Sequence, residues 1–277
     1  MTTVFPSRGL RYVALLAVVA MLIAGATVLA FNGSAHAKSP TRPKPTIVLV
    51  HGAWADASSW NGEIARLEAD GYTVDAPADP LRSLSGDAAY IASYLKTING
   101  PIVLVGHSYG GAVITNAATG NPHVKALVYI DGFAPEQRET VLSLAAKNPG
   151  SKLPTSITTV RYTDGTTSGV DVYINPVDFR AAFAGDVPAR KAALMAATQR
   201  PVTYAALSEP SGVPAWKTIP SWYLVGLRDE AIPPATQEFM AARMHARTVR
   251  ISSSHASLVS HPQAVTNLIL AAARSVG

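Results

Sequence analysis

One five-residue pattern, GHSYG at residues 106–110, restricts the local fold of this chain more than any other feature. It follows a short apolar run, Ile102–Val105, and precedes a stretch of small residues that begins at Gly111. The apolar run is typical of a buried strand, and the small residues favour a helix packed closely against it. A G-x-S-x-G pattern at such a turn holds the serine on a sharp bend. We therefore predict that Ser108 is a nucleophile, and not the solvated serine of an ordinary glycine-rich turn.

Apolar runs alternate with helix-like stretches on both sides of this pattern. The expected strands are Ile47–Val50, Tyr72–Asp75, Ile102–Val105, Ala126–Ile130, Ser221–Val225 and Thr248–Ile251. The expected helices are Ser59–Ala69, Asp87–Thr97, Gly111–Ala118, Ala235–Met244 and Pro262–Ala273. Continuous apolar runs indicate strands buried on both faces, as in parallel sheets covered by helices. The sequence thus predicts an α/β fold, with a doubly wound, mainly parallel sheet of about six strands.

The alternation stops between residues 133 and 217. This part contains the polar segment Thr155–Ser168 and short helical pieces, among them Pro176–Phe183 and Pro188–Thr198. Ligands of open α/β sheets bind at the carboxyl ends of the strands. We therefore expect this insertion to form a helical cap over that edge.

A serine nucleophile needs a base to accept its proton and a carboxylate to orient the base. Asp229 follows the expected strand Ser221–Val225, and His255 follows the last strand, so both lie at the same sheet edge as Ser108. The chain order serine, acid, histidine fits this architecture. Glu230 and Asp131 remain alternative acids, because Glu230 is adjacent to Asp229 and Asp131 ends another strand.

Acyl transfer also requires two hydrogen-bond donors for the oxyanion. One is expected to be the backbone N–H of Tyr109, which directly follows the nucleophile. The other is expected from the loop after the first strand, with Ala53 preferred and Trp54 as the alternative. We interpret His51 as a buried residue that braces this loop.

The remaining histidines carry no catalytic prediction. His261 precedes Pro262 and is interpreted as a structural residue at a helix entry, while His123 and His245 are expected on the surface. We interpret Trp60 as a packing or pocket-wall residue. The histidines show no metal-binding spacing, so no metal is expected. Acyl transfer by a serine nucleophile also needs no organic cofactor, so none is expected.

The N-terminal residues 1–37 resemble an export signal. Arg8 and Arg11 precede the uncharged apolar stretch Tyr12–Phe31, and Ala35 and Ala37 provide small residues for cleavage after residue 37. A spacer at 38–45 follows. An uncleaved membrane anchor is the alternative, because about 20 apolar residues can cross a bilayer. Cleavage predicts a secreted protein without stable membrane association.

Composition narrows the classes of function. The chain has no cysteine, so a thiol nucleophile and cysteine-ligated metals are excluded. The net charge is +5, yet the basic residues are scattered, whereas nucleic-acid binding needs a clustered basic face. We therefore expect no nucleic-acid partner. The oligomeric state is not determined by the sequence.

Four segments together resemble the α/β-hydrolase superfamily. They are HGAW at residues 51–54, GHSYGG at 106–111, GLRDEAIPP at 226–234 and SSSHASLVSHP at 252–262. Within the superfamily the chain is similar to small bacterial esterases related to plant methylesterases and hydroxynitrile lyases. The resemblance implies a hydrolase domain over residues 46–277 with a cap at about 133–217. It also implies Ser108, Asp229 and His255 as the triad, with Ala53 and Tyr109 as oxyanion donors.

The resulting hypothesis is a secreted carboxylic-ester hydrolase that acts on small or medium apolar esters through an acyl-enzyme. The same triad also serves acyl transfer, perhydrolysis or lyase chemistry. Related hydroxynitrile lyases carry a lysine directly after the catalytic histidine, where this chain has Ala256, so the resemblance argues against a lyase. A non-catalytic ligand-binding relative that uses only the cap pocket is the alternative from another class.

Overall fold

Six strands form one parallel sheet in the computed structural model, which describes residues 1–2 and 43–276. The sheet order is β2-β1-β3-β4-β8-β9, and each neighbouring pair is parallel. The strands are β1 (Thr46–Val50), β2 (Val74–Asp75), β3 (Ile102–His107), β4 (Val124–Ile130), β8 (Ser221–Gly226) and β9 (Arg247–Ile251). The predicted fold class is therefore confirmed.

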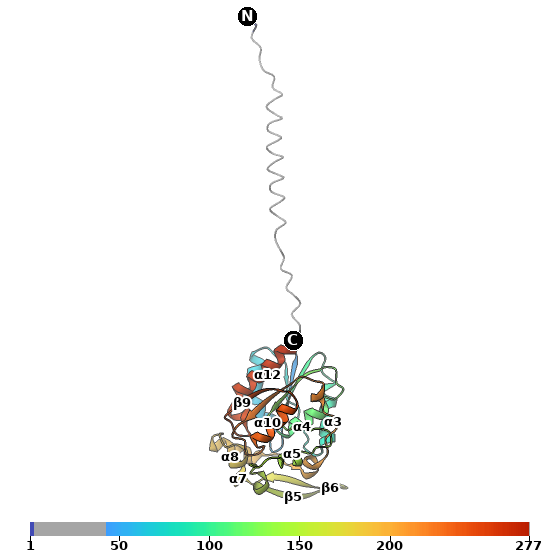
Figure 1. The fold of residues 1–277 in the computed structure, drawn as a ribbon, viewed down its shortest axis with the longest axis vertical. Coiled ribbons are helices and arrows are strands. Elements are labelled where there is room, and N and C mark those ends of the chain that lie inside the picture. Colours follow the sequence, from blue (N-terminus) through green and yellow to red (C-terminus); the bar gives the residue numbers. More distant parts are fainter. Residues whose placement is uncertain (3–42, 277) are drawn as a thin grey trace. The chain divides into compact units, whose positions relative to one another are not determined.

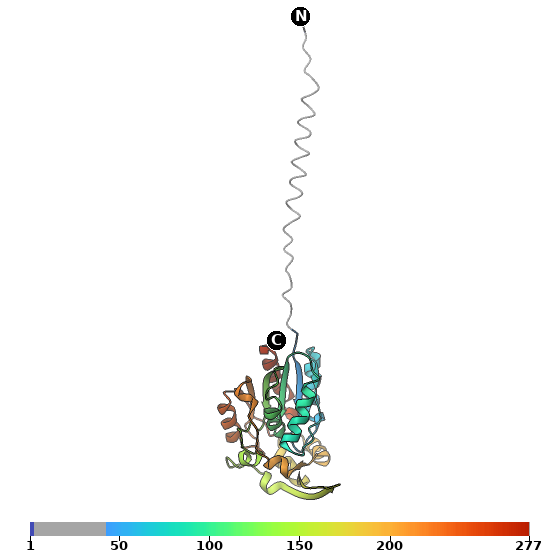
Figure 2. The ribbon, with the colours of Figure 1, turned by 90° about the vertical axis from the view of Figure 1, so that its right-hand side faces the viewer.

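Helices cover both faces of this sheet (Figure 2). One face packs against α3 (Leu84–Leu95), α4 (Tyr109–Ala117) and α10 (Pro234–Arg243). The other face packs against α2 (Asn61–Ala69), which continues the short helix η1 (Ala57–Trp60), and against α12 (Pro262–Val276). Within β1, Val48 and Val50 belong to the first layer, while Ile47 and Leu49 belong to the second. A strand apolar on both sides fits only between two covering layers.

The insertion between β4 and β8 contains helices together with a second sheet. Its elements are α5 (Val141–Ala145), α6 (Leu153–Ser156), β5 (Ile157–Asp164), β6 (Thr167–Ile174), α7 (Pro176–Phe183), α8 (Ala189–Thr198), β7 (Val202–Thr203), α9 (Tyr204–Ser208) and η2 (Ala215–Lys217). The strands pair antiparallel in the order β5-β6-β7. Figure 1 shows β5, β6, α7 and α8 together at the end of the domain opposite the C-terminus. We call residues 133–217 the cap.

The sheet within the cap was not predicted from the sequence. Most of the polar segment 155–168 forms β5 and the start of β6, and nearly all side chains of β5 are exposed. An exposed strand has no buried face, so it lacks the apolar alternation that identifies strands in a sequence. Only α7 and α8, which each bury apolar residues, carried a recognisable pattern.

In the part of the chain that the structure describes, no helix is long and apolar enough to cross a membrane. The predicted cleavage site and the apolar stretch Tyr12–Phe31 lie outside the described residues.

Candidate active site

Ser108 occupies the bend between β3, which ends at His107, and α4, which begins at Tyr109. Its backbone has φ 52° and ψ −123°, a conformation that costs free energy for a residue with a side chain. The bend is tight enough that a Cβ at Gly106 would lie 2.5 Å from the carbonyl oxygen of Gly110. The sequence pattern therefore produces the predicted strand–turn–helix, with Ser108 at its apex.

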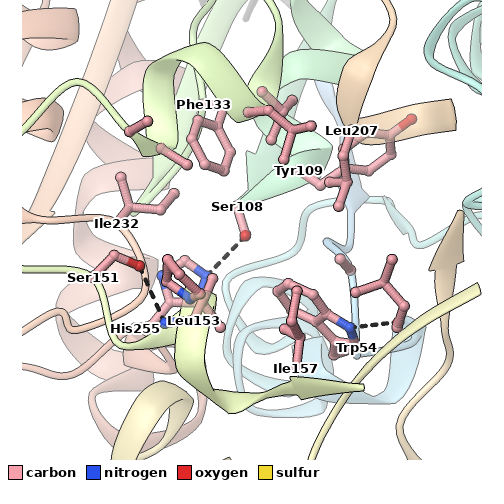
Figure 3. Close-up of a pocket in the computed structure, with 17 residues that line it drawn as sticks. Trp54, Ser108, Tyr109, Phe133, Ser151, Leu153, Ile157, Leu207, Ile232 and His255 are labelled. Atoms are coloured by element: carbon pink, nitrogen blue, oxygen red, sulfur yellow. Dashed lines mark hydrogen bonds between the residues drawn. The ribbon is translucent and has the colours of Figure 1, made fainter. Parts of the chain in front are cut away.

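Ser108, His255 and Asp229 form one chain of hydrogen bonds. His255 Nε2 lies 2.8 Å from Ser108 Oγ, and His255 Nδ1 lies 2.7 Å from Asp229 Oδ2 (Figure 3 shows the first contact). Because the Nδ1–H of His255 donates a hydrogen bond to Asp229, the neutral ring presents Nε2 as the acceptor for the serine hydroxyl. All three residues are buried. The structure thus brings together the three residues predicted from three separate strand ends.

The carboxylate of Asp229 receives further hydrogen bonds from its own loop and from α10. Its Oδ1 accepts the backbone N–H groups of Ala231 at 2.7 Å and Ile232 at 2.8 Å. Its Oδ2 also accepts Gln237 Nε2 at 2.7 Å. Together with the ring N–H of His255, these groups give the carboxylate four donors, which fix its orientation. Gln237 was missed in the sequence analysis, because nothing in the sequence distinguishes it from other polar residues of a helix.

Neither alternative acid contacts His255. Glu230 is partly exposed and pairs with Lys152 at 2.5 Å. Asp131 is fully buried and hydrogen-bonds Ser257 through its Oδ2. Burial and the nearby charge of Asp229 raise the pKa of Asp131 well above its usual range. The geometry therefore leaves Asp229 as the carboxylate that orients His255.

Two backbone N–H groups lie beside the bend at Ser108. A Cβ at Gly52 would lie 2.7 Å from Ser108 Cβ and 3.2 Å from Tyr109 N, so the loop after β1 passes directly over the bend. The N–H of Trp54 donates to the carbonyl of Arg200 at 3.0 Å and is not free. Within residues 43–276, the N–H groups of Ala53 and Tyr109 have no acceptor. This pattern favours Ala53 over Trp54 as the second oxyanion donor.

Two buried histidines brace the site. His51 accepts the N–H of Asp79 at Nε2 (3.0 Å) and donates from Nδ1 to its neighbour's carbonyl at Gly52 (2.9 Å). Burial lowers the pKa of His51 to about 4, so it is neutral, and its predicted bracing role is confirmed. His107 hydrogen-bonds the carbonyl oxygen of His255 through Nε2 at 2.9 Å. Because a carbonyl only accepts, His107 is the donor, which also fixes its tautomer.

A cavity of about 420 Å³ opens beside Ser108 and His255 (Figure 3). Its wall combines Ala53, Trp54, Tyr109 and Ile232 of the sheet domain with cap side chains. The cap contributes Phe133, Val141, Leu142, Ala145, Ala146, Ser151, Leu153, Pro154, Ile157, Val172 and Leu207. None of the lining side chains carries a fixed charge. Ser151, the one cap hydroxyl in the wall, donates to the carbonyl of Ala231 at 2.8 Å.

Residues outside the cavity also occupy the expected places. Trp60 is buried and packs edge-on against the ring of His107, whereas His123 and His245 are exposed. His261 ends the short helix α11 (Ser257–Ser260) directly before α12. Within the described part of the chain, no group of three histidine or acidic side chains is arranged to hold a metal ion.

The family model described as "Alpha/beta hydrolase family" matches residues 47–268. The pyrethroid hydrolase of Sphingobium wenxiniae is 28% identical over 255 residues, which cover 80% of this chain and 85% of that protein. A carbendazim hydrolyzing esterase of Nocardioides sp. is 34% identical over 113 residues, 36% of this chain and only 47% of that protein. The putative methylesterase 11 of Arabidopsis thaliana is 27% identical over 251 residues, which cover 82% of this chain and 63% of that protein.

Solved structures show the same fold. Polyneuridine aldehyde esterase superposes with a TM-score of 0.72 at 18% identity, covering 83% of this chain and 99% of that one. A pyrethroid hydrolase from Sphingobium faniae superposes with a TM-score of 0.67 at 22% identity, covering 83% of this chain and 98% of that one.

Proposed function

Because the chain belongs to the alpha/beta hydrolase family, we propose that it is a secreted serine esterase that cleaves neutral, apolar carboxylic esters. The observation that carries this proposal is the hydrogen-bond chain from Ser108 through His255 to Asp229 at the wall of an uncharged cavity. Relatives named as esterases and hydrolases support ester cleavage as the reaction.

In the first half of the reaction, Ser108 Oγ attacks the ester carbonyl carbon while its proton passes to His255 Nε2. The carbonyl oxygen becomes an oxyanion, and the N–H groups of Ala53 and Tyr109 are placed to donate to it. The C–O bond to the alcohol then breaks, and His255 returns the proton to the leaving oxygen. The product of this half is an acyl group on Ser108 and a free alcohol.

In the second half, water attacks the acyl carbon and gives one proton to His255 Nε2. The bond to Ser108 Oγ breaks, the serine recovers its proton, and the carboxylic acid leaves. Throughout both halves Asp229 holds the Nδ1–H tautomer of His255 and stabilises its charged form. No metal or organic cofactor enters these steps.

The cavity wall supports the substrate class. Apart from the reacting groups, a bound ester meets aliphatic and aromatic surface, so each buried apolar group of the substrate contributes to binding. A charged substituent would lose its hydration without finding a partner, which disfavours charged esters. The carboxylate product is disfavoured for the same reason, and this aids its release.

Export rests on the N-terminal pattern alone. Two arginines, an apolar stretch and the Ala35–Ala37 site support cleavage after residue 37. The mature protein would then begin at Lys38, which N-terminal sequencing of protein from the culture medium tests.

A fluorophosphonate probe tests the proposed chemistry, because it modifies activated serines. We expect one adduct at Ser108, located by mass spectrometry, and turnover of a short-chain aryl ester. The Ser108→Ala variant should lose the adduct and lower turnover by at least about 10⁴-fold. A folded wild-type protein that neither labels nor hydrolyses the ester would contradict the proposal and favour a binding protein on this scaffold.

A further inference from the structure

The cap contacts the loop that carries His255 as well as the substrate cavity. Phe183 is the last residue of α7, and Asp186 follows in the connection to α8. The ring of Phe183 meets that of His255 edge-on, with centroids 4.8 Å apart. Neither Phe183 nor Asp186 was singled out in the sequence as a site residue.

Asp186 binds the residue directly before His255. Its Oδ2 accepts the backbone N–H of Ser254 at 3.1 Å, and its Oδ1 accepts the Ser254 hydroxyl at 2.5 Å. The Asp186 side chain is only 10% exposed. A nearly buried carboxylate that receives two hydrogen bonds from one residue fixes both the backbone and the side chain of that residue.

The surroundings of Asp186 favour its charged form. Arg228 Nη2 lies 3.7 Å away and His261 Nδ1 lies 3.5 Å away. Burial opposes ionisation, but the two hydrogen bonds from Ser254, with smaller contributions from Ser260 and His261, hold the pKa of Asp186 below its usual value. Arg228 directly precedes Asp229, so Asp186 lies between the loops that carry the acid and the base.

The backbone around His255 is thus held at two points. The first contact comes from the sheet domain, where the buried residue His107 donates to the carbonyl oxygen of His255. The second comes from the cap, where Asp186 accepts the N–H of Ser254. Because the imidazole must reach Ser108 and Asp229 at once, a small shift of this backbone lengthens at least one of two contacts of 2.7–2.8 Å.

We propose that Asp186 is a positioning residue for His255, so that the cap contributes to the chemical step as well as to binding. The inference rests on the proposed function, in which His255 is the base. Asp186 does not line the cavity, so its loss is expected to lower kcat and leave KM nearly unchanged. A cap residue that acts only through substrate binding would change KM instead.

Asp171 offers a matched control. It is also a cap aspartate that joins the cap to the sheet domain, through Arg82 at 2.7 Å, and it contacts neither His255 nor the residues beside it. If Asp186 merely holds the cap in place, replacing either aspartate by asparagine should have similar effects. If Asp186 positions His255, only its own replacement should slow the chemistry.

The experiment compares Asp186→Asn, Ser254→Ala and Asp171→Asn with the wild type. Steady-state hydrolysis of an apolar aryl ester gives kcat and KM, and fluorophosphonate titration counts the active molecules in each preparation. We expect Asp186→Asn to lower kcat per active molecule by roughly 10- to 100-fold, as for a displacement of a catalytic group by about 1 Å. KM should stay within about threefold, because no cavity contact is lost.

Ser254→Ala removes one partner of Asp186 without altering the cap. It should also lower kcat, but by a smaller factor than Asp186→Asn, because the backbone contact remains. If Asp186→Asn fails to fold, Ser254→Ala still tests the inference. Asp171→Asn should stay within about twofold of the wild type, as expected for a partly exposed ion pair.

Four results would overturn the inference, and one of them would do so by refuting the proposed function on which it rests. Equal kcat values for Asp186→Asn and Asp171→Asn would show that Asp186 only attaches the cap. A raised KM with unchanged kcat would place its effect in binding. A wild-type protein that is not labelled at Ser108 would refute the proposed function itself, whereas normal wild-type labelling with unaffected Asp186 and Ser254 variants would refute only the positioning role.

Discussion

The parallel sheet and the cap contribute to one site by different physical means. The sheet supplies Ser108, Asp229 and His255 from the carboxyl ends of β3, β8 and β9, and each is held by several hydrogen bonds. The cap supplies most of the cavity wall, which is apolar and uncharged. Polar groups act only at defined distances, whereas apolar contact depends on area and tolerates variation. We therefore expect the sheet to supply the reacting groups of the proposed chemistry, and selectivity to vary with the cap.

The sheet and the cap also differ in how deeply their strands are buried. Strands β1, β3 and β8 of the main sheet are buried on both faces, so their positions are fixed by packing. Strand β5 of the cap is exposed along nearly its whole length. Asp186 joins the two regions through Ser254, which is why the cap is expected to affect the base and not only the wall.

Replacing Asp229, the acid that the main sheet supplies, should give the largest effect on catalysis among these comparisons. Asp229→Asn keeps the size of the side chain but no longer enforces the Nδ1–H tautomer of His255. We expect kcat for ester hydrolysis to fall by about 10³- to 10⁴-fold. The measurement is steady-state hydrolysis of the apolar aryl ester at neutral pH.

The two alternative acids provide the controls for this substitution. Glu230→Gln removes only a partly exposed ion pair with Lys152 and should stay within about twofold of the wild type. Asp131→Asn changes a carboxyl group that hydrogen-bonds Ser257 and does not contact His255, so a small loss is expected. A loss for Asp131→Asn as large as that for Asp229→Asn would reassign the acid.

Shortening a cap side chain in the cavity wall should give an intermediate effect of a different kind. Leu207→Ala removes apolar area from the cavity wall, so KM for an apolar ester should rise by roughly tenfold while kcat changes less. Leu194→Ala, a change in the exposed part of the cap, should leave both constants within about twofold, because that side chain is 62% exposed and does not line the cavity. A kcat loss without a KM increase for Leu207→Ala would break the division of roles between sheet and cap.

Replacing Glu63 of α2, which is fully buried, should give the smallest effect on catalysis. Both of its carboxyl oxygens lack a partner among the described residues, and burial raises its pKa from 4.5 to about 9. Between these two values the folded state holds a proton that the unfolded state releases, so stability falls as pH rises through this window. Glu63→Gln does not titrate, and at pH 8 it should increase the free energy of unfolding by about 1–3 kcal/mol.

Thermal unfolding at pH 5 and pH 8 checks this expectation. The stability difference between Glu63→Gln and the wild type should be small at pH 5 and grow towards pH 8, while kcat and KM remain unchanged. A difference independent of pH would mean that the carboxyl group is ionised in the folded protein.

Local sequence was sufficient for the sheet and for the position of Ser108 at the bend between β3 and α4. Runs such as Ile47–Val50 and Ile102–Val105 are apolar at every position, and only strands covered on both faces bury such runs completely. The GHSYG pattern allows the close approach that a strained serine at a strand-to-helix bend requires. The strand ends then restricted the acid and the base to a few candidates at one edge.

Tertiary structure decided between those candidates. Asp131, Asp229 and Glu230 all follow strands of the main sheet, and only their distances and burial show that Asp229 contacts His255. Likewise, the choice of Ala53 over Trp54 depends on the hydrogen bond from Trp54 to Arg200, a residue distant in sequence. His107 and Asp186 act through partners far along the chain, and Gln237 bonds Asp229 from a different element eight residues away, so no local pattern marks them. Sequence patterns record which face of an element is buried, whereas hydrogen bonds between distant segments exist only once the chain has folded.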